Sequence, residues 1–179
     1  IAYQMDAGYL RVSGVLSVYH TRGARAMKIG VISDTHGSLP PLARKALEGC
    51  DHIIHAGDIC GQNVLLRLEQ IAPVTAVYGN CDFDDYGPDV QSKAQVTLDG
   101  LRFYIAHRPQ DLPYLNPAQF DVAIHGHTHI PVVKREHGVL LVNPGSPSRP
   151  RGDEGPTVAC IETKDGLVKD ARIIPLLSR

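Results

Sequence analysis

Three short apolar runs, each separated from the next by a segment with helical spacing, constrain the fold of this 179-residue chain most strongly. The apolar runs cover residues 29–33, 53–56 and 74–78, and the helical segments cover residues 40–48 and 64–71. Runs that are apolar throughout are typical of strands buried on both faces. A strand–helix–strand–helix–strand order predicts a parallel sheet with right-handed crossovers.

The second half of the sequence instead predicts β-hairpins. Each of three pairs of strand-like segments is joined by a short turn that contains glycine, which is a strong hairpin signal. The pairs cover residues 95–98 and 101–105, 132–136 and 139–142, and 157–162 and 167–174. A further short strand is expected at residues 122–124. We therefore expect an α/β fold in which two mixed β-sheets pack as a sandwich flanked by helices, in four layers.

The overall composition argues against several classes of protein. The formal net charge of −1 gives no sign of a nucleic-acid partner or of binding to an anionic membrane surface. No apolar run approaches the length that crosses a membrane. The four cysteines include no C-x-x-C pair, which favours a reduced cytoplasmic protein over a disulfide framework or a zinc ribbon. A chain of this length suggests one domain, and the sequence leaves a homo-oligomer open.

The first 26 residues differ from the rest of the chain, because they have no sustained apolar period. The apolar run at residues 15–18 is too short for the core of a signal peptide. We expect residues 1–26 to be an N-terminal extension, either disordered or added to the chain artificially, rather than a functional arm. Residues 27–179 are expected to form the functional domain.

Polar residues follow the apolar runs at the points where the predicted strands end. Asp34, Asp58 and Asn80 each follow one of the three parallel strands, whose carboxyl ends converge on the ligand crevice of an open sheet. A single aspartate in such a position is usually a turn or a helix cap. Three such polar residues, each at the end of a parallel strand, favour a shared site, and His127 and His129 follow a fourth strand.

The types of these side chains indicate metal binding. Carboxylate, amide and imidazole groups suit manganese, iron, zinc or nickel better than a thiolate cluster would. A pair of such ions can clamp both the attacking and the leaving oxygen in a displacement at phosphorus. The residues alone therefore predict a phosphoester hydrolase with a small-molecule substrate.

The order of the motifs, D-x-H, G-D, G-N-x-D, H and G-H-x-H, resembles that of the calcineurin-like metallophosphoesterase family. The sequence reads S-D-T-H-G, H-A-G-D, Y-G-N-C-D, H-G-H-T-H and N-P-G-S, and so looks like the small bacterial and archaeal phosphodiesterase branch. The match runs from Met27 to the C-terminus, which implies that residues 27–179 are a metallophosphoesterase domain. The family fold is a pair of mixed sheets between helices.

The resemblance implies two divalent metal ions, with manganese expected and nickel, iron, zinc or cobalt as alternatives. It assigns the first ion to Asp34, His36, Asp58 and His129, and the second ion to Asp58, Asn80, His107 and His127. Asp58 would bridge the ions, and Asp58, Asn80 and His107 are also expected to take part in catalysis. An extended segment is expected to point His127 and His129 to the same side.

The resemblance also implies a mechanism without an organic cofactor, in which a hydroxide shared by the two ions attacks phosphorus in line with the leaving group. Many monoesterases of the family carry a histidine at the position of Cys81, where it is thought to protonate that group. A cysteine is a weak donor and a poor acid at neutral pH. Cys81 therefore favours phosphodiesters or activated esters over alkyl monoesters, unless it is only a small packing residue.

Several further residues are candidates for contact with the substrate or for support of the ligands. Asp82 is expected to hold a ligand through a hydrogen bond. Arg108 stands where the family usually has a glycine, so it could crowd the site or bind phosphate. Ser146 and Arg149, with Arg151, could contact a phosphate oxygen, and the alternative is an ordinary exposed loop.

Two other functions stay open beside a phosphodiesterase. One is a phosphomonoesterase of the same family, which Cys81 disfavours. The other is a non-catalytic scaffold that binds proteins with the same fold, as in the related retromer subunit. All seven ligand positions are chemically competent here, which favours an enzyme. His55 and His125 are expected to be packed within strands or to support ligands.

Overall fold

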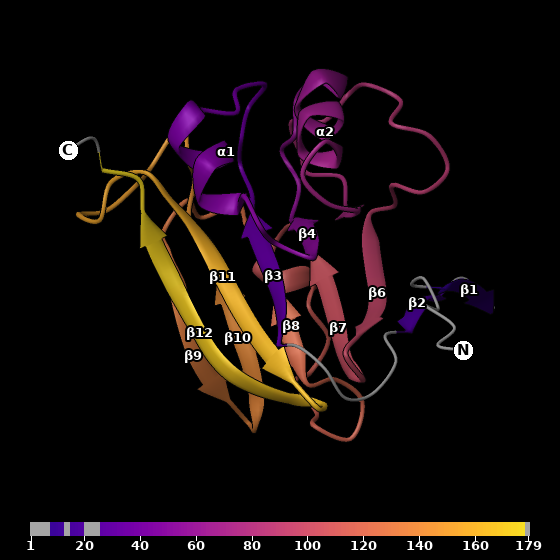
Figure 1. The fold of residues 1–179 in the computed structure, drawn as a ribbon. Coiled ribbons are helices and arrows are strands. Elements are labelled where there is room, and N and C mark those ends of the chain that lie inside the picture. The colour runs from indigo at the N-terminus through magenta and orange to yellow at the C-terminus, as the bar shows by residue number, and fades with distance from the viewer. Residues whose placement is uncertain (1–7, 13–14, 20–25, 178–179) are drawn as a thin grey trace, which may run out of the picture.

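A computed structural model of the protein describes residues 8–12, 15–19 and 26–177. The parallel half of the chain is built as the apolar runs predict (Figure 1). In chain order it contains β3 (Met27–Ile32), α1 (Pro41–Leu47), β4 (His52–His55), α2 (Gln62–Glu69) and β5 (Val74–Ala76). Strands β3, β4 and β5 pair in parallel. Helix α1 starts with a proline at its first position, where the missing backbone N–H costs no hydrogen bond.

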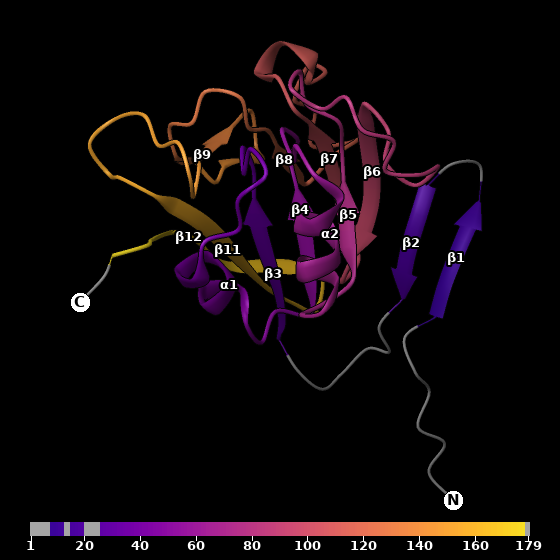
Figure 2. The same cartoon turned by 90° about the horizontal axis from the view of Figure 1, so that it is seen from above.

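These three strands belong to a five-stranded mixed sheet. The predicted C-terminal hairpin, β11 (Thr157–Lys164) and β12 (Leu167–Pro175), extends the sheet on the side of β3 in the order β12-β11-β3-β4-β5. Strand β11 pairs with β3 in antiparallel fashion, with Cys160 opposite Gly30. Helices α1 and α2 lie on the face of this sheet that points away from the second sheet (Figure 2).

The second sheet contains the two remaining predicted hairpins and the isolated strand. Its strands from the middle of the chain are β6 (Lys93–Leu98), β7 (Leu101–Ala106), β8 (Val122–Ile124), β9 (Val132–Glu136) and β10 (Val139–Asn143). A short 3₁₀ helix at Pro109–Asp111 follows β7. The prediction of two packed mixed sheets flanked by helices is confirmed.

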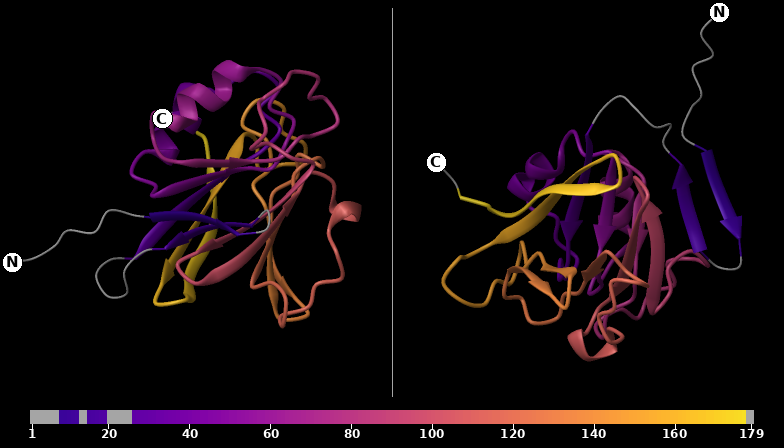
Figure 3. Two further views of the ribbon diagram at one scale, coloured as in Figure 1. Left: turned by 90° about the vertical axis from the view of Figure 1, so that its right-hand side faces the viewer. Right: turned by 90° about the horizontal axis from the view of Figure 1, so that it is seen from below.

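Two N-terminal strands that the sequence patterns did not predict complete the second sheet. Strands β1 (Gly8–Val12) and β2 (Val15–Tyr19) form an antiparallel hairpin, and β2 pairs in parallel with β6. The full order is β1-β2-β6-β7-β8-β10-β9, with the hairpin at one edge (Figures 2 and 3). That residues 1–26 are an extension outside the functional domain stays a prediction.

The core lies mainly between the two sheets. Its buried residues alternate along the strands that face one another, and they include Ile29, Val31, Phe103, Ile124 and Ile161. A second cluster packs helices α1 and α2 against the outer face of the five-stranded sheet. Neither helix is long and apolar enough to cross a membrane. Burial on both faces therefore fixes the ends of β3, β4 and β5 at one edge of the molecule, where the loops carry the polar motifs.

Candidate metal centre

The polar motifs meet at the seam between the two sheets. Asp34 and Asp58 lie in the loops that follow β3 and β4, and Asn80 follows β5. The histidines come from the other sheet, because His107 follows β7 directly, and His127 and His129 follow β8. In Figure 1 this seam lies at the upper ends of β3 and β4. Each sheet therefore contributes part of one site.

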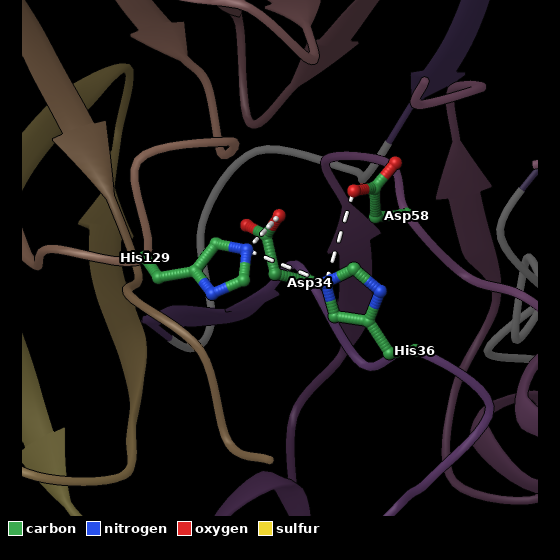
Figure 4. Close-up of side chains that lie close together, drawn as sticks. All are labelled: Asp34, His36, Asp58 and His129. Carbon is green, nitrogen blue, oxygen red and sulfur yellow. Dashed lines mark hydrogen bonds and ion pairs between the residues drawn. The ribbon is translucent and has the colours of Figure 1, made fainter. Parts of the chain in front are cut away.

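Four of the predicted ligands form a compact cluster (Figure 4). One possible ligand atom from each of Asp34, His36, Asp58 and His129 lies within 4.8 Å of the others. His129 Nε2 is 3.1 Å from Asp34 Oδ1. His36 Nε2 is 3.3 Å from His129 Nε2 and 3.8 Å from Asp58 Oδ2. These residues form a candidate metal site of two carboxylates and two imidazoles.

The remaining predicted ligands lie on the other side of Asp58. His107 Nε2 is 3.3 Å from Asp58 Oδ1, and the ring centroids of His107 and His127 are 5.2 Å apart. Asn80 and His127 line the same pocket as Asp58. That pocket has a volume of about 400 Å³ and is also lined by Cys81, Arg149, Pro150 and Arg151. The structure thus brings together all seven residues that the sequence analysis nominated as ligands.

Backbone carbonyls set the orientation of two of the imidazoles. His107 Nδ1 donates to the Ala56 carbonyl at 2.8 Å, and His129 Nδ1 donates to the Arg149 carbonyl at 2.5 Å. Because a carbonyl only accepts, the proton of each neutral ring is on Nδ1, and Nε2 presents a lone pair to the site. This is the orientation that metal-binding histidines usually have.

Lone pairs of these imidazoles therefore face carboxylate oxygens across the site. Asp34 Oδ1 and His107 Nε2 are buried and have no hydrogen-bond partner among the described residues. Asp34 is completely buried, and Asp58 is 2% exposed. Buried carboxylates and buried acceptors of this kind are costly unless a cation or a proton lies among them. The donor set and its geometry fit divalent metal ions.

The ionisation of the carboxylates follows from burial and from their neighbours. Burial raises the pKa of Asp34. Burial alone would also raise the pKa of Asp58, but the neighbouring His107 imidazole and a hydrogen bond from the Cys81 amide hold it well below its usual range. Burial opposes the charged form of His107, yet the nearby Asp58 carboxylate raises the pKa of the imidazole.

Six residues of the site have a left-handed backbone. The φ angles are +54° at Asp34, +46° at His36, +54° at Asp58, +56° at Cys60, +68° at His127 and +59° at His129. This conformation is uncommon for residues other than glycine and costs on the order of 1–2 kcal/mol per residue. Such outliers cluster where the surrounding structure imposes a functional geometry.

The left-handed backbone corrects one prediction of the sequence analysis. His127 and His129 do not lie on an extended segment, because both have positive φ and Thr128 N donates to the Gly126 carbonyl at 2.8 Å in a tight turn. The turn sends His127 toward His107 and His129 toward His36. The two rings therefore reach different parts of the site through a turn rather than through the period of a strand.

Asp82 and Ser146 support the backbone of the site. Asp82 accepts hydrogen bonds from the amides of Cys60 and Gly79, both at 2.7 Å, so it holds the backbone of the loops rather than a ligand directly. Ser146 is fully buried, and its hydroxyl donates to the Asp34 carbonyl at 2.7 Å. This hydrogen bond uses the single hydroxyl proton of Ser146. The suggestion that Ser146 donates to a phosphate oxygen was therefore wrong.

The two arginine candidates differ in position. Arg149 and Arg151 line the pocket, and the Arg149 amide donates to Ser146 Oγ at 2.9 Å. Arg108 is exposed and does not line this pocket, although its charge lowers the pKa of His127 after the larger effect of burial. The loop after β10 therefore brings positive charge to this pocket, whereas Arg108 does not reach it.

Supporting residues that the sequence analysis missed hold the loop after β3. Thr35 Oγ1 lies 3.0 Å from His55 Nε2, and Ser148 Oγ donates to the carbonyl of Thr35 at 2.9 Å. His55 is fully buried, and burial lowers its pKa to about 4. His125 is buried as well, so both histidines are packed as expected. Thr35 lies inside a ligand motif, but nothing in the sequence pattern around Ser148 marked it.

Comparisons with known proteins all point to one family. The model of the calcineurin-like phosphoesterase superfamily domain matches residues 27–166. A probable metallophosphoesterase of Methanothermobacter thermautotrophicus is 36% identical over 161 residues, covering 83% of this chain and 92% of the relative. Phosphodiesterase YfcE of Escherichia coli K12 is 34% identical over 153 residues, covering 70% of this chain and 82% of the relative.

Solved structures agree on the fold. A structure described as a novel archaeal phosphodiesterase is 32% identical, with a TM-score of 0.67, and the match covers 83% of this chain and 99% of that one. Vacuolar protein sorting 29 from Cryptosporidium parvum has a TM-score of 0.67 at 21% identity, covering 83% of this chain and 97% of that one. The second likeness concerns the fold alone.

Proposed function

Because the chain belongs to the calcineurin-like phosphoesterase superfamily and is a metal-dependent phosphoric ester hydrolase, we propose that it holds two divalent ions and acts preferentially on phosphodiesters. We further propose that residues 27–179 form the catalytic domain and that manganese is the working metal. The mixture of oxygen and imidazole donors supports manganese, iron, nickel, cobalt or zinc over a metal that prefers thiolates.

The position of Asp58 between two groups of histidines is the observation that carries the proposal of two ions. Its Oδ2 atom faces His36 at 3.8 Å, and its Oδ1 atom faces His107 at 3.3 Å. One oxygen is therefore available to each side of the site. Asp34, His36 and His129 would complete the first coordination sphere, and Asn80, His107 and His127 would complete the second.

The protein groups around this site have separate tasks in the proposed hydrolysis. When bound, two divalent ions would supply a water molecule of lowered pKa and would neutralise charge on the phosphoryl oxygens. Arg149 and Arg151, which line the pocket, would bind a phosphoryl oxygen and orient the ester. The carbonyls of Ala56 and Arg149 keep His107 and His129 in the orientation that the site requires.

Cys81 supports the preference for diesters. It lines the pocket beside Asp58, where burial and then the negative charge of Asp58 raise the pKa of the thiol. Such a thiol is a poor donor of a proton to an alkoxide. Diesters with good leaving groups do not need that proton. The test is a panel of aryl and alkyl phosphomonoesters and phosphodiesters, measured with manganese, nickel, zinc and magnesium.

The panel distinguishes the proposed activity from its alternatives. We expect the highest kcat/KM for the nitrophenyl diester. A higher value for the matching monoester with every metal would support the phosphomonoesterase instead. Turnover of no substrate with any metal would favour a protein-binding scaffold, which the fold shared with vacuolar protein sorting 29 keeps as the second candidate.

The metal content gives a direct prediction. We expect two ions per chain after manganese loading and removal of free metal, as measured by elemental analysis. Because the ions bind the folded state and satisfy buried carboxylates, they should also raise the melting temperature by several degrees. A stoichiometry of one ion or fewer per chain at saturation would refute the proposed second metal ion.

The substitution Cys81→His tests the origin of the substrate preference. An imidazole at this position could act as a general acid, which contributes roughly 10²–10⁴-fold where proton transfer limits the rate. We expect a fraction of that gain, roughly tenfold, for an alkyl monoester relative to a nitrophenyl diester. The two rates should be compared in wild type and variant with the same metal. An unchanged ratio in a variant that still binds metal would assign the preference to the Arg149 loop instead.

A further inference from the structure

Two cysteines outside the metal centre lie close together on the helix-covered face of the five-stranded sheet. Cys160 is in the middle of β11, and Cys50 lies in the turn between α1 and β4. Ala159 and Ile161 face the core between the sheets, and Val158 packs beneath the helices. Because side chains alternate along a strand, Cys160 shares the face of Val158 and points to the side of α1.

A glycine on the intervening strand leaves room for the two sulfur atoms. Gly30 of β3 is directly opposite Cys160, so their Cβ positions would lie about 5 Å apart. Cys50 Sγ is 3.1 Å from the position that a Cβ atom on Gly30 would occupy. Leu47 Cδ2, at 2.5 Å from that position, and the Cys50 sulfur together occupy the space that a side chain at position 30 would take, next to the side chain of Cys160.

The surroundings of the pair favour one thiolate. Interaction with the neighbouring Cys50 thiol lowers the pKa of Cys160, and the same interaction raises the pKa of Cys50. Arg172 on β12 is directly opposite Cys160, and its charge lowers the pKa of Cys160 further. Cys160 is 3% exposed, whereas Cys50 is partly exposed and gives reagents access to the pair.

We propose that Cys50 and Cys160 form a reversible redox pair that closes to a disulfide by exchange with small-molecule disulfides such as oxidised glutathione. The more accessible Cys50 sulfur, after passing its proton to Cys160, attacks one sulfur of the reagent and releases the first thiolate. Cys160 then gives that proton to the released thiolate, attacks Cys50 Sγ and releases the second thiolate. The protein loses two electrons and one proton, and the reagent, with one further proton from solvent, leaves as two reduced thiols.

The bond would link positions roughly 110 residues apart in the sequence, and it would tie the turn after α1 to β11 across β3. A cross-link over so long a stretch of chain restricts the unfolded state strongly. The metal centre is separate, because Asp34 lies four residues beyond Gly30, or about 13 Å along an extended strand. The proposed disulfide is thus a stabilising switch, distinct from the catalytic chemistry.

Peptide mapping of the oxidised full-length protein tests the linkage. Trypsin leaves Cys50 and Cys60 on one peptide, residues 46–67, so the mapping uses Cys60→Ser beside wild type. In that variant Cys50, Cys81 and Cys160 lie on separate peptides, residues 46–67, 68–93 and 152–164. Incubation with oxidised glutathione should join the first peptide to the third. Linkage of Cys81 to either partner, or no linkage at equilibrium, would overturn the proposal.

Stability measurements on the metal-loaded wild-type protein provide a second readout. Oxidation should raise the melting temperature by roughly 5–10 °C, and dithiothreitol should reverse the gain. Cys50→Ser and Cys160→Ser should each abolish this difference between oxidised and reduced samples, whatever their own stability. Cys60→Ser is the matched control and should keep it. A wild-type melting temperature that does not respond to oxidation would also refute the switch.

Discussion

Replacing Asp58 with asparagine is expected to abolish hydrolysis while the fold is retained. The amide keeps the shape of the side chain but has one weak oxygen ligand and no charge, so it cannot serve both sides of the site. A loss of about 10³-fold in kcat, or about 4 kcal/mol of transition-state stabilisation, is expected. Asparagine also tolerates the left-handed backbone at this position, where φ is +54°. The measurement is diester hydrolysis with saturating manganese.

His137→Asn is the matched control for this substitution. His137 also has a left-handed backbone, with φ of +50°, but it is exposed and packs beside Tyr114, away from the metal centre. We expect its activity to equal that of wild type. If Asp58→Asn kept more than a tenth of the wild-type rate, Asp58 could not be the bridging ligand.

Adding one methyl group at Gly126 is expected to damage both stability and activity. A Cβ atom there would lie 1.9 Å from Ser33 Oγ and 2.7 Å from Asp34 Oδ2. At Gly79 the corresponding distances are 2.1 Å to Asp58 Oδ1 and 2.2 Å to Asp58 N. Gly126→Ala and Gly79→Ala should each cost about 3 kcal/mol of folding free energy through overpacking. Displacement of a carboxylate by about 1 Å should lower kcat roughly 10²-fold or more.

Gly49→Ala separates this steric effect from the effect of backbone conformation. Among the described residues, no atom lies within 4 Å of a Cβ atom at Gly49, although its φ of +77° makes alanine unfavourable. This variant should lose about 1 kcal/mol of stability and keep its activity. Thermal melts and diester kinetics on all three variants provide the comparison. Normal activity in Gly126→Ala would show that the Asp34 carboxylate need not occupy its present position.

The order and type of the elements from Met27 onward could be predicted because the hydrophobic pattern there is strong. Strand β8 was expected at residues 122–124, where it lies, and the three hairpins differ from expectation by at most two residues at their ends. Strands β1 and β2 were not expected, since residues 1–26 have no sustained apolar period. Their place in the sheet depends on pairing with β6, a non-local contact that a sequence window does not contain.

The residues of the candidate site could be predicted from the sequence, but the backbone conformation that holds them could not. Each nominated ligand follows a recognisable strand, so the topology alone brought them to the same edge. The turn at His127 and His129 was mistaken for an extended segment, because an H-x-H spacing fits both conformations. The tasks of Ser146 and Asp82 depend on loops that meet only in the folded protein, and their residue types fitted several roles equally well.

The placement of the metal centre on the seam between the sheets has a consequence for folding kinetics. The candidate ligands extend from Asp34 to His129 along the chain, and they come together only when both sheets have formed and docked. Bound metal can therefore contribute little to a folding nucleus that precedes docking. Its stabilisation should appear mainly as slower unfolding, because interactions absent from the transition state act on that rate. Metal supply would then control how long the folded protein lasts rather than how fast it forms.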